Sequence, residues 1–246
     1  MTISGKKIAI TGASRGLGAA LATIAADRGA IPILLGRQPF ALEDTALAIE
    51  ARCGVRPDAF VCDLADTHSV ASAADKLSSI HPDIDILVNN GSYWVGGAFE
   101  AINDAELHAI IGSTVTGTMA LTRHLLPLLS TRPQADIHTV VSMSGLQYAR
   151  LRGSSLPFRA AKAAQDGFVQ GLVEELADSR IRVTSVYPGI IEDISPLDAA
   201  WNEERGPEDR LTNKDVVEAI LFALSAPPNV AIRSLVIERA RSEFLG

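Results

Sequence analysis

The amino-acid sequence predicts an α/β fold in a single domain, with helices on both faces of a doubly wound, seven-stranded parallel sheet. The chain has 246 residues, of which 47% are hydrophobic and 21% charged, as in an ordinary globular domain. Short apolar runs alternate regularly with stretches of helical period. The runs are hydrophobic at consecutive positions, which is typical of parallel strands covered on both faces.

Seven apolar runs are interpreted as the strands. They begin at residues 6, 31, 58, 85, 138, 182 and 233 and read KKIAITG, IPILLGR, DAFVCDL, DILVNNG, HTVVSMS, RVTSVYPG and RSLVIE. Helical patterns between them include LGAALATIAADRG (17–29) and AAKAAQDGFVQGLVEELAD (160–178). Residues 192–211 carry neither pattern. A segment this long inside a compact domain is either disordered or a functional lid, and we predict a lid over the substrate. Ligands of such sheets bind at the carboxyl ends of the strands, so the residues after each strand are the candidate site.

Composition and charge exclude several classes of function. Acidic residues outnumber basic ones, for a formal net charge of −7, which argues against a nucleic-acid-binding surface. No apolar run is long enough to span a bilayer, and the first residues, MTISGKKIAITG, lack the apolar core of a signal peptide. Cys53 and Cys62 suggest neither a disulfide framework nor a metal site. We therefore expect a cytoplasmic protein with no metal, nucleic-acid or membrane partner.

A glycine-rich turn follows the first strand. It reads TGASRGLG, with Gly12, Gly16 and Gly18 at positions that allow a tight turn and close packing of the next helix. A helix that begins near Gly16 offers free amide donors and the positive end of its dipole to a diphosphate. The turn therefore predicts a nucleotide cofactor.

The order of motifs along the chain resembles the short-chain dehydrogenase/reductase family. The turn has the spacing T-G-x-x-x-G-x-G, and CDL (62–64), NNG (89–91), the pair Phe158 and Lys162, and YPG (187–189) follow in order. The resemblance covers essentially the whole chain. It implies a Rossmann-type fold, hydride transfer between a nicotinamide cofactor and a carbonyl or alcohol substrate, and a homodimer or homotetramer.

The residue after the second strand favours NADP(H) as the cofactor. Enzymes that use NAD usually carry an acid there, whereas this chain has Arg37, and Arg15 lies in the glycine turn. Two guanidinium groups can clamp a 2′-phosphate that a carboxylate would repel. The resemblance implies that Asp63 bonds the adenine, with Leu64 beside it. The full set of implied cofactor residues is Gly12, Ser14, Arg15, Gly16, Leu17, Gly18, Arg37, Asp63, Leu64, Asn90, Gly91, Lys162, Pro188, Gly189 and Ile191.

The resemblance also implies a catalytic group of serine, tyrosine and lysine, often with an asparagine in the long fourth helix. Ser144 is our candidate for the serine, with Ser142 as the alternative. Lys162 matches the lysine, and Thr114 stands at the asparagine position. The tyrosine position, one helical turn before Lys162, is occupied by Phe158, which cannot donate a proton.

Three interpretations of Phe158 stay open. It is an engineered change in a working enzyme, or a natural mark of a relative that binds NADP(H) as a sensor or assembly subunit without catalysis. Alternatively, another hydroxyl replaces the missing one, with Tyr148 and Tyr93 as candidates. A further departure is Asp193, where the family often has a threonine that bonds the cofactor's carboxamide.

The substrate side is poorly specified by the sequence. We expect its walls to come from SYWVGGAF (92–99), LQYARLRG (146–153) and residues 192–211. These segments supply aromatic side chains, together with Arg150 and Arg152, which could face an anionic substrate.

Overall fold

The computed structural model describes residues 3–149 and 153–241, so Arg150 and Arg152 lie outside the described residues. It confirms the predicted seven-stranded parallel sheet, with strand order β3-β2-β1-β4-β5-β6-β9. The strands are β1 (Lys7–Thr11), β2 (Ile31–Gly36), β3 (Ala59–Val61), β4 (Ile86–Asn89), β5 (Ala135–Val140), β6 (Ile181–Pro188) and β9 (Ser234–Ile237). The order reverses between β1 and β4, which places a crevice for ligands at their carboxyl ends.

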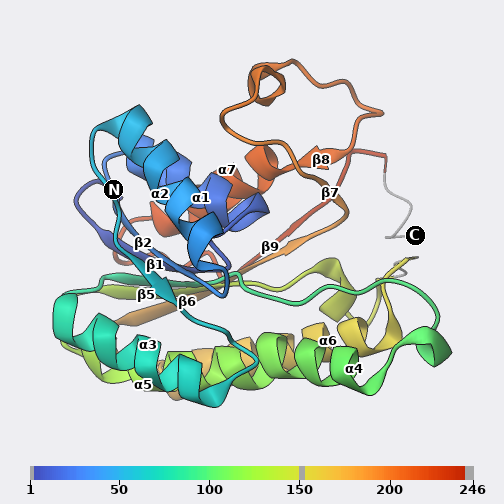
Figure 1. The fold of residues 1–246 in the computed structure, drawn as a ribbon, viewed down its shortest axis with the longest axis horizontal. Coiled ribbons are helices and arrows are strands. Elements are labelled where there is room, and N and C mark those ends of the chain that lie inside the picture. Colours follow the sequence, from blue (N-terminus) through green and yellow to red (C-terminus); the bar gives the residue numbers. More distant parts are fainter. Residues whose placement is uncertain (1–2, 150–152, 242–246) are drawn as a thin grey trace.

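Helices cover both faces of the sheet, as predicted (Figure 1). One face carries α1 (Gly16–Asp27), α2 (Pro39–Cys53) and α7 (Asn213–Leu224). The other carries α3 (Thr67–Ile80), α4 (Asp104–Ile111), the π-helical turn η2 (Gly112–Gly117), α5 (Thr118–Ser130) and α6 (Leu156–Glu175). Short 3-10 turns lie at η1 (Phe99–Ala101), η3 (Met143–Gly145) and η4 (Ala199–Asn202).

Side chains that alternate along the strands build the two cores. In β2, Ile33 and Leu35 pack into one apolar cluster and Leu34 into the other, and all three are fully buried. Successive strand residues point to opposite faces, so a sheet covered on both faces needs apolar residues at consecutive positions. Within the described residues, no helix is both long and apolar enough to cross a membrane.

The segment 192–211 contains short elements that the sequence pattern did not reveal. Strand β7 (Ile191–Glu192) pairs in parallel with β8 (Leu211–Thr212), and η4 lies between them. Figure 1 shows the connection between β7 and β8 as a large orange loop that stands off the sheet on the side of α7. Trp201 in this loop is 7% exposed and belongs to the apolar cluster of α1, α2 and α7. The loop is therefore attached to the core by its own tryptophan.

A buried histidine in β5 predicts that acid will destabilise the fold. The side chain of His138 is fully buried, and its Nδ1 lies 2.8 Å from Thr184 Oγ1. Burial disfavours the charged imidazolium and lowers the pKa of His138 from 6.5 to about 3. Between these two pH values the unfolded chain binds a proton that the folded protein excludes. The free energy of unfolding therefore falls as the pH drops below about 6.5, by about 1.4 kcal/mol per pH unit from this residue.

Urea denaturation of the His138→Gln variant between pH 7 and 5 measures this contribution. We expect the variant to lose less stability over this range than the unsubstituted protein. The matched control is His68→Gln, which removes an imidazole from the exposed side of α3. Equal pH dependence in the His138 variant and the parent protein would contradict the assignment.

Candidate cofactor cleft and active site

A cleft of about 400 Å³ lies at the carboxyl ends of β1, β2, β3 and β4. It brings together eleven of the residues predicted to bind the cofactor, namely Gly12, Ser14, Arg15, Gly16, Leu17, Gly18, Arg37, Asp63, Leu64, Asn90 and Gly91. These residues lie in the turns that follow strands and in the first turn of α1, where Gly16, Leu17 and Gly18 stand. The lining also includes Ser92, Tyr93, Ser113 and Asp193, which the prediction of cofactor contacts did not include.

Glycines hold the first turn against its neighbours. Gly12 has φ +68°, and a Cβ there would lie 2.9 Å from the Cα of Gly91. A Cβ at Gly18 would lie only 2.2 Å from the carbonyl oxygen of Gly12. Real Cβ atoms do not approach that closely, so both positions require glycine for the backbone of the turn and of the fourth strand to pack together.

The N-terminus of α1 opens into the cleft without a side-chain cap from its N-cap residue. Its N-cap residue is Arg15, whose side chain makes no capping hydrogen bond, and the first turn of the helix carries no acidic residue. The first amide groups of a helix have no intrahelical acceptor, and they lie at the positive end of the helix dipole. This helix end therefore suits an anionic group such as a diphosphate.

Thr11 ties the glycine turn to the end of β4. Its Oγ1 accepts hydrogen bonds from the backbone N–H groups of Asn90 (2.9 Å) and Gly91 (2.8 Å). Asn90 in turn donates from Nδ2 to the carbonyl oxygen of Thr11 at 2.9 Å. The cleft floor is thus fixed by bonds between two strands that lie side by side at the switch point. Next to it, Asp63 accepts the N–H of Ala65 at 3.0 Å, which shapes the turn after β3.

Two exposed arginines stand at the rim of the cleft. Arg15 ends the glycine turn and Arg37 follows β2 directly. The Arg37 guanidinium lies 5.2 Å from the centre of the Tyr93 ring, a cation–π contact that reaches across the cleft from β2 to the segment after β4. The residue after Arg37 is Gln38, so neither of the two residues that follow β2 carries a carboxylate.

Four residues that the resemblance assigned to the cofactor lie outside this lining. Pro188 ends β6, and Gly189 donates its N–H to Ile237 of β9 at 2.9 Å. Ile191 pairs with Leu211 in the small sheet of β7 and β8. The fourth, Lys162, is buried in α6. Pro188 and Gly189 share the carboxyl edge of the large sheet with the cleft.

Lys162 is the centre of a buried polar network. Its Nζ donates to the Val140 carbonyl oxygen (3.0 Å) and to Gln165 Oε1 (2.9 Å). Gln165 donates from Nε2 to the carbonyl oxygen of Thr114 at 3.1 Å. Thr114 lies in the π-helical turn η2, and its Oγ1 is 2.8 Å from Ser92 Oγ. Burial lowers the pKa of Lys162 from 10.5 to about 7.

The network joins two predicted residues, Lys162 and Thr114, through one that the sequence reasoning missed. Gln165 stands three residues after Lys162 on α6. This i, i+3 spacing puts both side chains on one face of the helix, and it is the sequence signal that could have identified Gln165 as a partner of Lys162. π-helical turns inside α-helices are frequent at functional sites. Here the Thr114 carbonyl inside η2 is available to a side chain of another helix.

The two candidate serines have different surroundings. Ser142 Oγ accepts the N–H of Ser144 at 3.1 Å, and Ser142 has φ 149° and ψ 152°, a backbone conformation that costs a non-glycine residue about 1–3 kcal/mol. Ser144 Oγ lies 3.2 Å from Ser154 Oγ, just before α6 begins. The Ser142 side chain therefore stabilises the turn after β5, whereas the Ser144 hydroxyl lies beside that of Ser154. Ser154 was not predicted from the sequence.

Phe158 packs in a small apolar cluster beside Lys162. Its side chain is 8% exposed and contacts the cluster of Ile110 and Ala161, against which Tyr93 and Val95 also pack. The Nζ atom of Lys162 lies 5.7 Å from the centre of the Phe158 ring. Of the two alternative hydroxyls, Tyr93 therefore lies beside the Phe158 cluster, whereas Tyr148 is 64% exposed.

Comparisons with known proteins agree with this fold. The family described as short chain dehydrogenase matches residues 6–206. The chain is 30% identical over 243 residues to the NADP-dependent 3-hydroxy acid dehydrogenase of Schizosaccharomyces pombe, covering 96% of this chain and 93% of that protein. It is 28% identical over 232 residues to an uncharacterized oxidoreductase of Staphylococcus saprophyticus, covering 94% and 96%.

Solved structures share the fold over nearly the whole chain. L-sorbose reductase from Gluconobacter frateurii, complexed with NADPH and L-sorbose, superimposes with a TM-score of 0.84 at 23% identity, covering 98% of this chain and 99% of that one. A short-chain type dehydrogenase/reductase from Mycobacterium marinum gives a TM-score of 0.84 at 26% identity, covering 98% and 97%. The matching family extends over most of the sequence, from β1 through the loop after β7. The chain therefore belongs to the short-chain dehydrogenase family.

Proposed function

We propose that this protein binds NADP(H) and transfers hydride between the nicotinamide and a carbonyl or alcohol substrate. The observation that carries the proposal is the cleft, in which the uncapped N-terminus of α1, the close-packed glycines and the arginines at positions 15 and 37 meet at the switch point of the sheet. An anionic dinucleotide fits these features, since it offers a diphosphate to the helix end and a 2′-phosphate to the arginines. The NADP-dependent relative from S. pombe supports the same cofactor.

The residues beside the cleft have distinct proposed roles. Bound NADP(H) would supply or accept the hydride. Ser144 holds the substrate oxygen through its hydroxyl, with Ser154 Oγ 3.2 Å away. Lys162 holds the nicotinamide ribose, and Gln165 and Thr114 position its ammonium group. The family's proton donor belongs at position 158, where the phenylalanine ring supplies no proton.

A second candidate function is favoured by Phe158. With no hydroxyl at this position and with Lys162 Nζ donating to Val140 and Gln165, the site has the parts to bind a cofactor and lacks the general acid. The alternative is therefore a non-catalytic NADP(H)-binding sensor or assembly subunit. Binding of NADPH without turnover of any carbonyl would favour this function, and turnover would exclude it.

We also propose the arrangement of the whole protein that the family resemblance implies. The chain acts as one NADP(H)-binding domain, and residues 192–211 serve as its substrate lid. It works in the cytoplasm as a homodimer or homotetramer. Size-exclusion chromatography with light scattering measures the oligomeric state directly.

The proposed function predicts a preference for NADPH over NADH that depends on Arg37. Replacing Arg37 by methionine removes a charge-assisted contact to the 2′-phosphate, and we expect NADPH affinity to fall about tenfold while NADH affinity stays unchanged. Titration of each nicotinamide cofactor by fluorescence measures both affinities. Arg28→Met is the matched control, because Arg28 follows the far end of α1 and pairs with Glu218.

Oxidation of NADPH with a panel of aldehydes, ketones and quinones tests the catalytic half of the proposal. Turnover of one carbonyl class, with NADPH preferred over NADH, supports the oxidoreductase. A protein that binds neither cofactor would contradict the proposed function altogether. Loss of NADPH affinity in the Arg28 variant as well would show that the arginine effect is not local to the rim.

A further inference from the structure

One charged residue in the cleft does not suit the proposed cofactor. The carboxylate of Asp193 lies at the N-terminus of α1, where a Cβ built on Gly16 would be 3.4 Å from Asp193 Oδ2 and 3.8 Å from Oδ1. Asp193 lines the cofactor cleft and also an adjoining hollow of about 380 Å³ between α1, α2 and residues 195–198. A negative group therefore already stands at the helix end to which the proposed function assigns the diphosphate.

Asp193 is held in this place by the first residue of α7. Asn213 is 2% exposed, and its Nδ2 donates to Asp193 Oδ1 and, at 3.3 Å, to the carbonyl oxygen of Ile194. Asn213 itself is fixed, because the preceding Thr212 forms a capping box with Asp215 at the start of the helix. The start of α7 therefore fixes the position of the Asp193 carboxylate.

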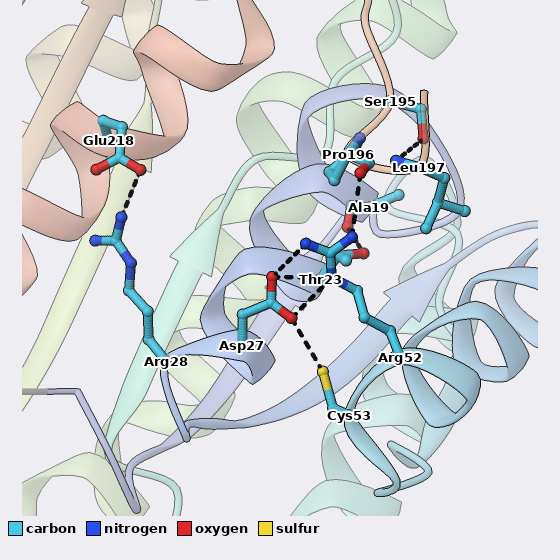
Figure 2. A network of polar contacts seen from close by, with 10 residues as sticks. All are labelled: Ala19, Thr23, Asp27, Arg28, Arg52, Cys53, Ser195, Pro196, Leu197 and Glu218. Atoms are coloured by element: carbon cyan, nitrogen blue, oxygen red, sulfur yellow. Dashed lines mark hydrogen bonds and ion pairs between the residues drawn. The ribbon is translucent and has the colours of Figure 1, made fainter. Parts of the chain in front are cut away.

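A second anchor holds the residues that follow Asp193. In Figure 2, the Arg52 guanidinium lies between Asp27 of α1 and the chain around Pro196. Arg52 donates from Nη1 to the Pro196 carbonyl oxygen at 3.2 Å, and from Nε to both carboxylate oxygens of Asp27 at 2.8 and 2.9 Å. Residues 193–198, called the strap here, are therefore attached to α7 at one end and to α1 and α2 at the other.

The electrostatics of α1 explain why a carboxylate is accepted there. The helix has no acidic residue in its first turn and no side-chain cap, so its free amides and positive dipole end lack an internal counter-charge. Asp193 provides that charge from another part of the chain. A diphosphate with two negative charges in the same position is repelled by it.

We propose that Asp193 competes with the cofactor's diphosphate for the N-terminus of α1, and that NADP(H) binding displaces its carboxylate and shifts the strap. This inference rests on the proposed function, because it needs NADP(H) to bind in the cleft. It makes Asp193 a residue that sets cofactor affinity. The charge on Asp193 weakens binding without taking part in hydride transfer.

The Asp193→Asn variant tests the proposal by direct binding. Asparagine has nearly the same shape and can still accept the hydrogen bond from Asn213, so it removes the charge and keeps the anchor. We expect the Kd for NADPH, measured by fluorescence titration or calorimetry, to fall about tenfold. Asp193→Thr is a second variant that removes the charge. Its Kd for NADPH should also be lower than that of the parent protein.

Two controls separate a local effect from a general change in charge. Glu192→Gln removes the neighbouring carboxylate, which pairs with Arg205 on the exposed side of the segment, and should leave the Kd for NADPH unchanged. Adenosine 2′-monophosphate lacks the diphosphate, so its Kd should be the same for the parent protein and for both Asp193 variants.

The outcomes that overturn the proposal are distinct from failure of the proposed function. Equal or weaker NADPH binding by both Asp193 variants, with the parent protein binding normally, overturns the competition alone. An equal gain for adenosine 2′-monophosphate overturns it too, since the effect would then not be local to the diphosphate. If no protein in the series binds NADPH, the proposed function and the competition fail together.

Discussion

Replacing Phe158 by tyrosine is expected to raise the rate of NADPH-dependent carbonyl reduction by about two to four orders of magnitude. This is the range over which a positioned general acid typically accelerates a reaction. The other proposed residues stand on the same helix and in the segments just before it. Ser144 and Ser154 lie hydroxyl to hydroxyl, and Lys162 Nζ is 5.7 Å from the ring centre.

The environment of the ring supports a gain from one added oxygen. Tyrosine keeps the shape of phenylalanine, so the apolar contacts with Ile110 and Ala161 can persist. Burial lowers the pKa of Lys162 to about 7, so the amine carries its proton below that pH and loses it above. A phenol next to this group gains its strongest electrostatic support when the lysine is protonated, and we expect the activity of the tyrosine variant to depend on pH near 7.

The measurement is kcat and kcat/KM on the same carbonyl panel, with NADPH affinity determined separately. The control is Phe168→Tyr, a partly buried ring on the same helix that packs against the main core. It adds the same oxygen away from Lys162 and should not change the rate. Tight NADPH binding without turnover in both variants would contradict the prediction and favour the non-catalytic function. Turnover by the parent protein that Tyr93→Phe abolishes would instead identify Tyr93 as the replacement hydroxyl.

Most of the fold could be predicted because its strands are buried on both faces. Such strands appear as continuous apolar runs, and each of the seven runs corresponds to a strand of the sheet. The exception is the start of β5, which begins at Ala135, three residues before the run that predicted it at 138. Asp136 interrupts the apolar pattern there. It is tolerated in the buried strand because Arg182 of the neighbouring strand pairs with it.

The cofactor cleft was predictable for a related reason. Its predicted residues lie in the turns after the strands or at the start of the helix that follows, so the order of strands and motifs along the chain was enough to place it. Contacts between distant segments were not predictable in this way. The pairing of Ser144 with Ser154 and the bond from Gln165 to Thr114 depend on the geometry of a loop and a π-helical turn, which no local pattern specifies. The approach of Asp193 to Gly16 depends likewise on how β7 is joined to α7.

The largest expected loss of stability comes from Arg182, which no sequence motif marked. Its guanidinium is buried and donates from Nε to Asp136. The other nitrogens donate to backbone carbonyls at the end of α7 and in the loop after it, namely those of Leu224 (2.9 Å), Ala226 (3.0 Å), Pro227 (3.3 Å) and Val230 (2.9 Å). One side chain therefore joins β6 to β5 and bonds the last carbonyl of α7 together with three carbonyls of the loop after it.

Replacing Arg182 by methionine leaves the Asp136 carboxylate buried without its counter-charge and removes the donors from those carbonyls. We expect a loss of about 3–5 kcal/mol in the free energy of unfolding, measured by urea denaturation. Arg180→Met is the control two residues earlier, where the side chain is exposed, and its effect should stay within about 0.5 kcal/mol. A loss below about 1 kcal/mol in the Arg182 variant would contradict the assigned role.

The double variant Asp136→Leu with Arg182→Met separates the two parts of that loss. If the unpaired carboxylate causes most of it, removing the carboxylate as well should restore part of the stability, because an apolar pair can replace a buried ion pair at little cost. If the lost bonds to the end of α7 dominate, the double variant should be no more stable than Arg182→Met alone. Arg182 would then stabilise the fold mainly through its hydrogen bonds to those carbonyls, and less through its ion pair with Asp136.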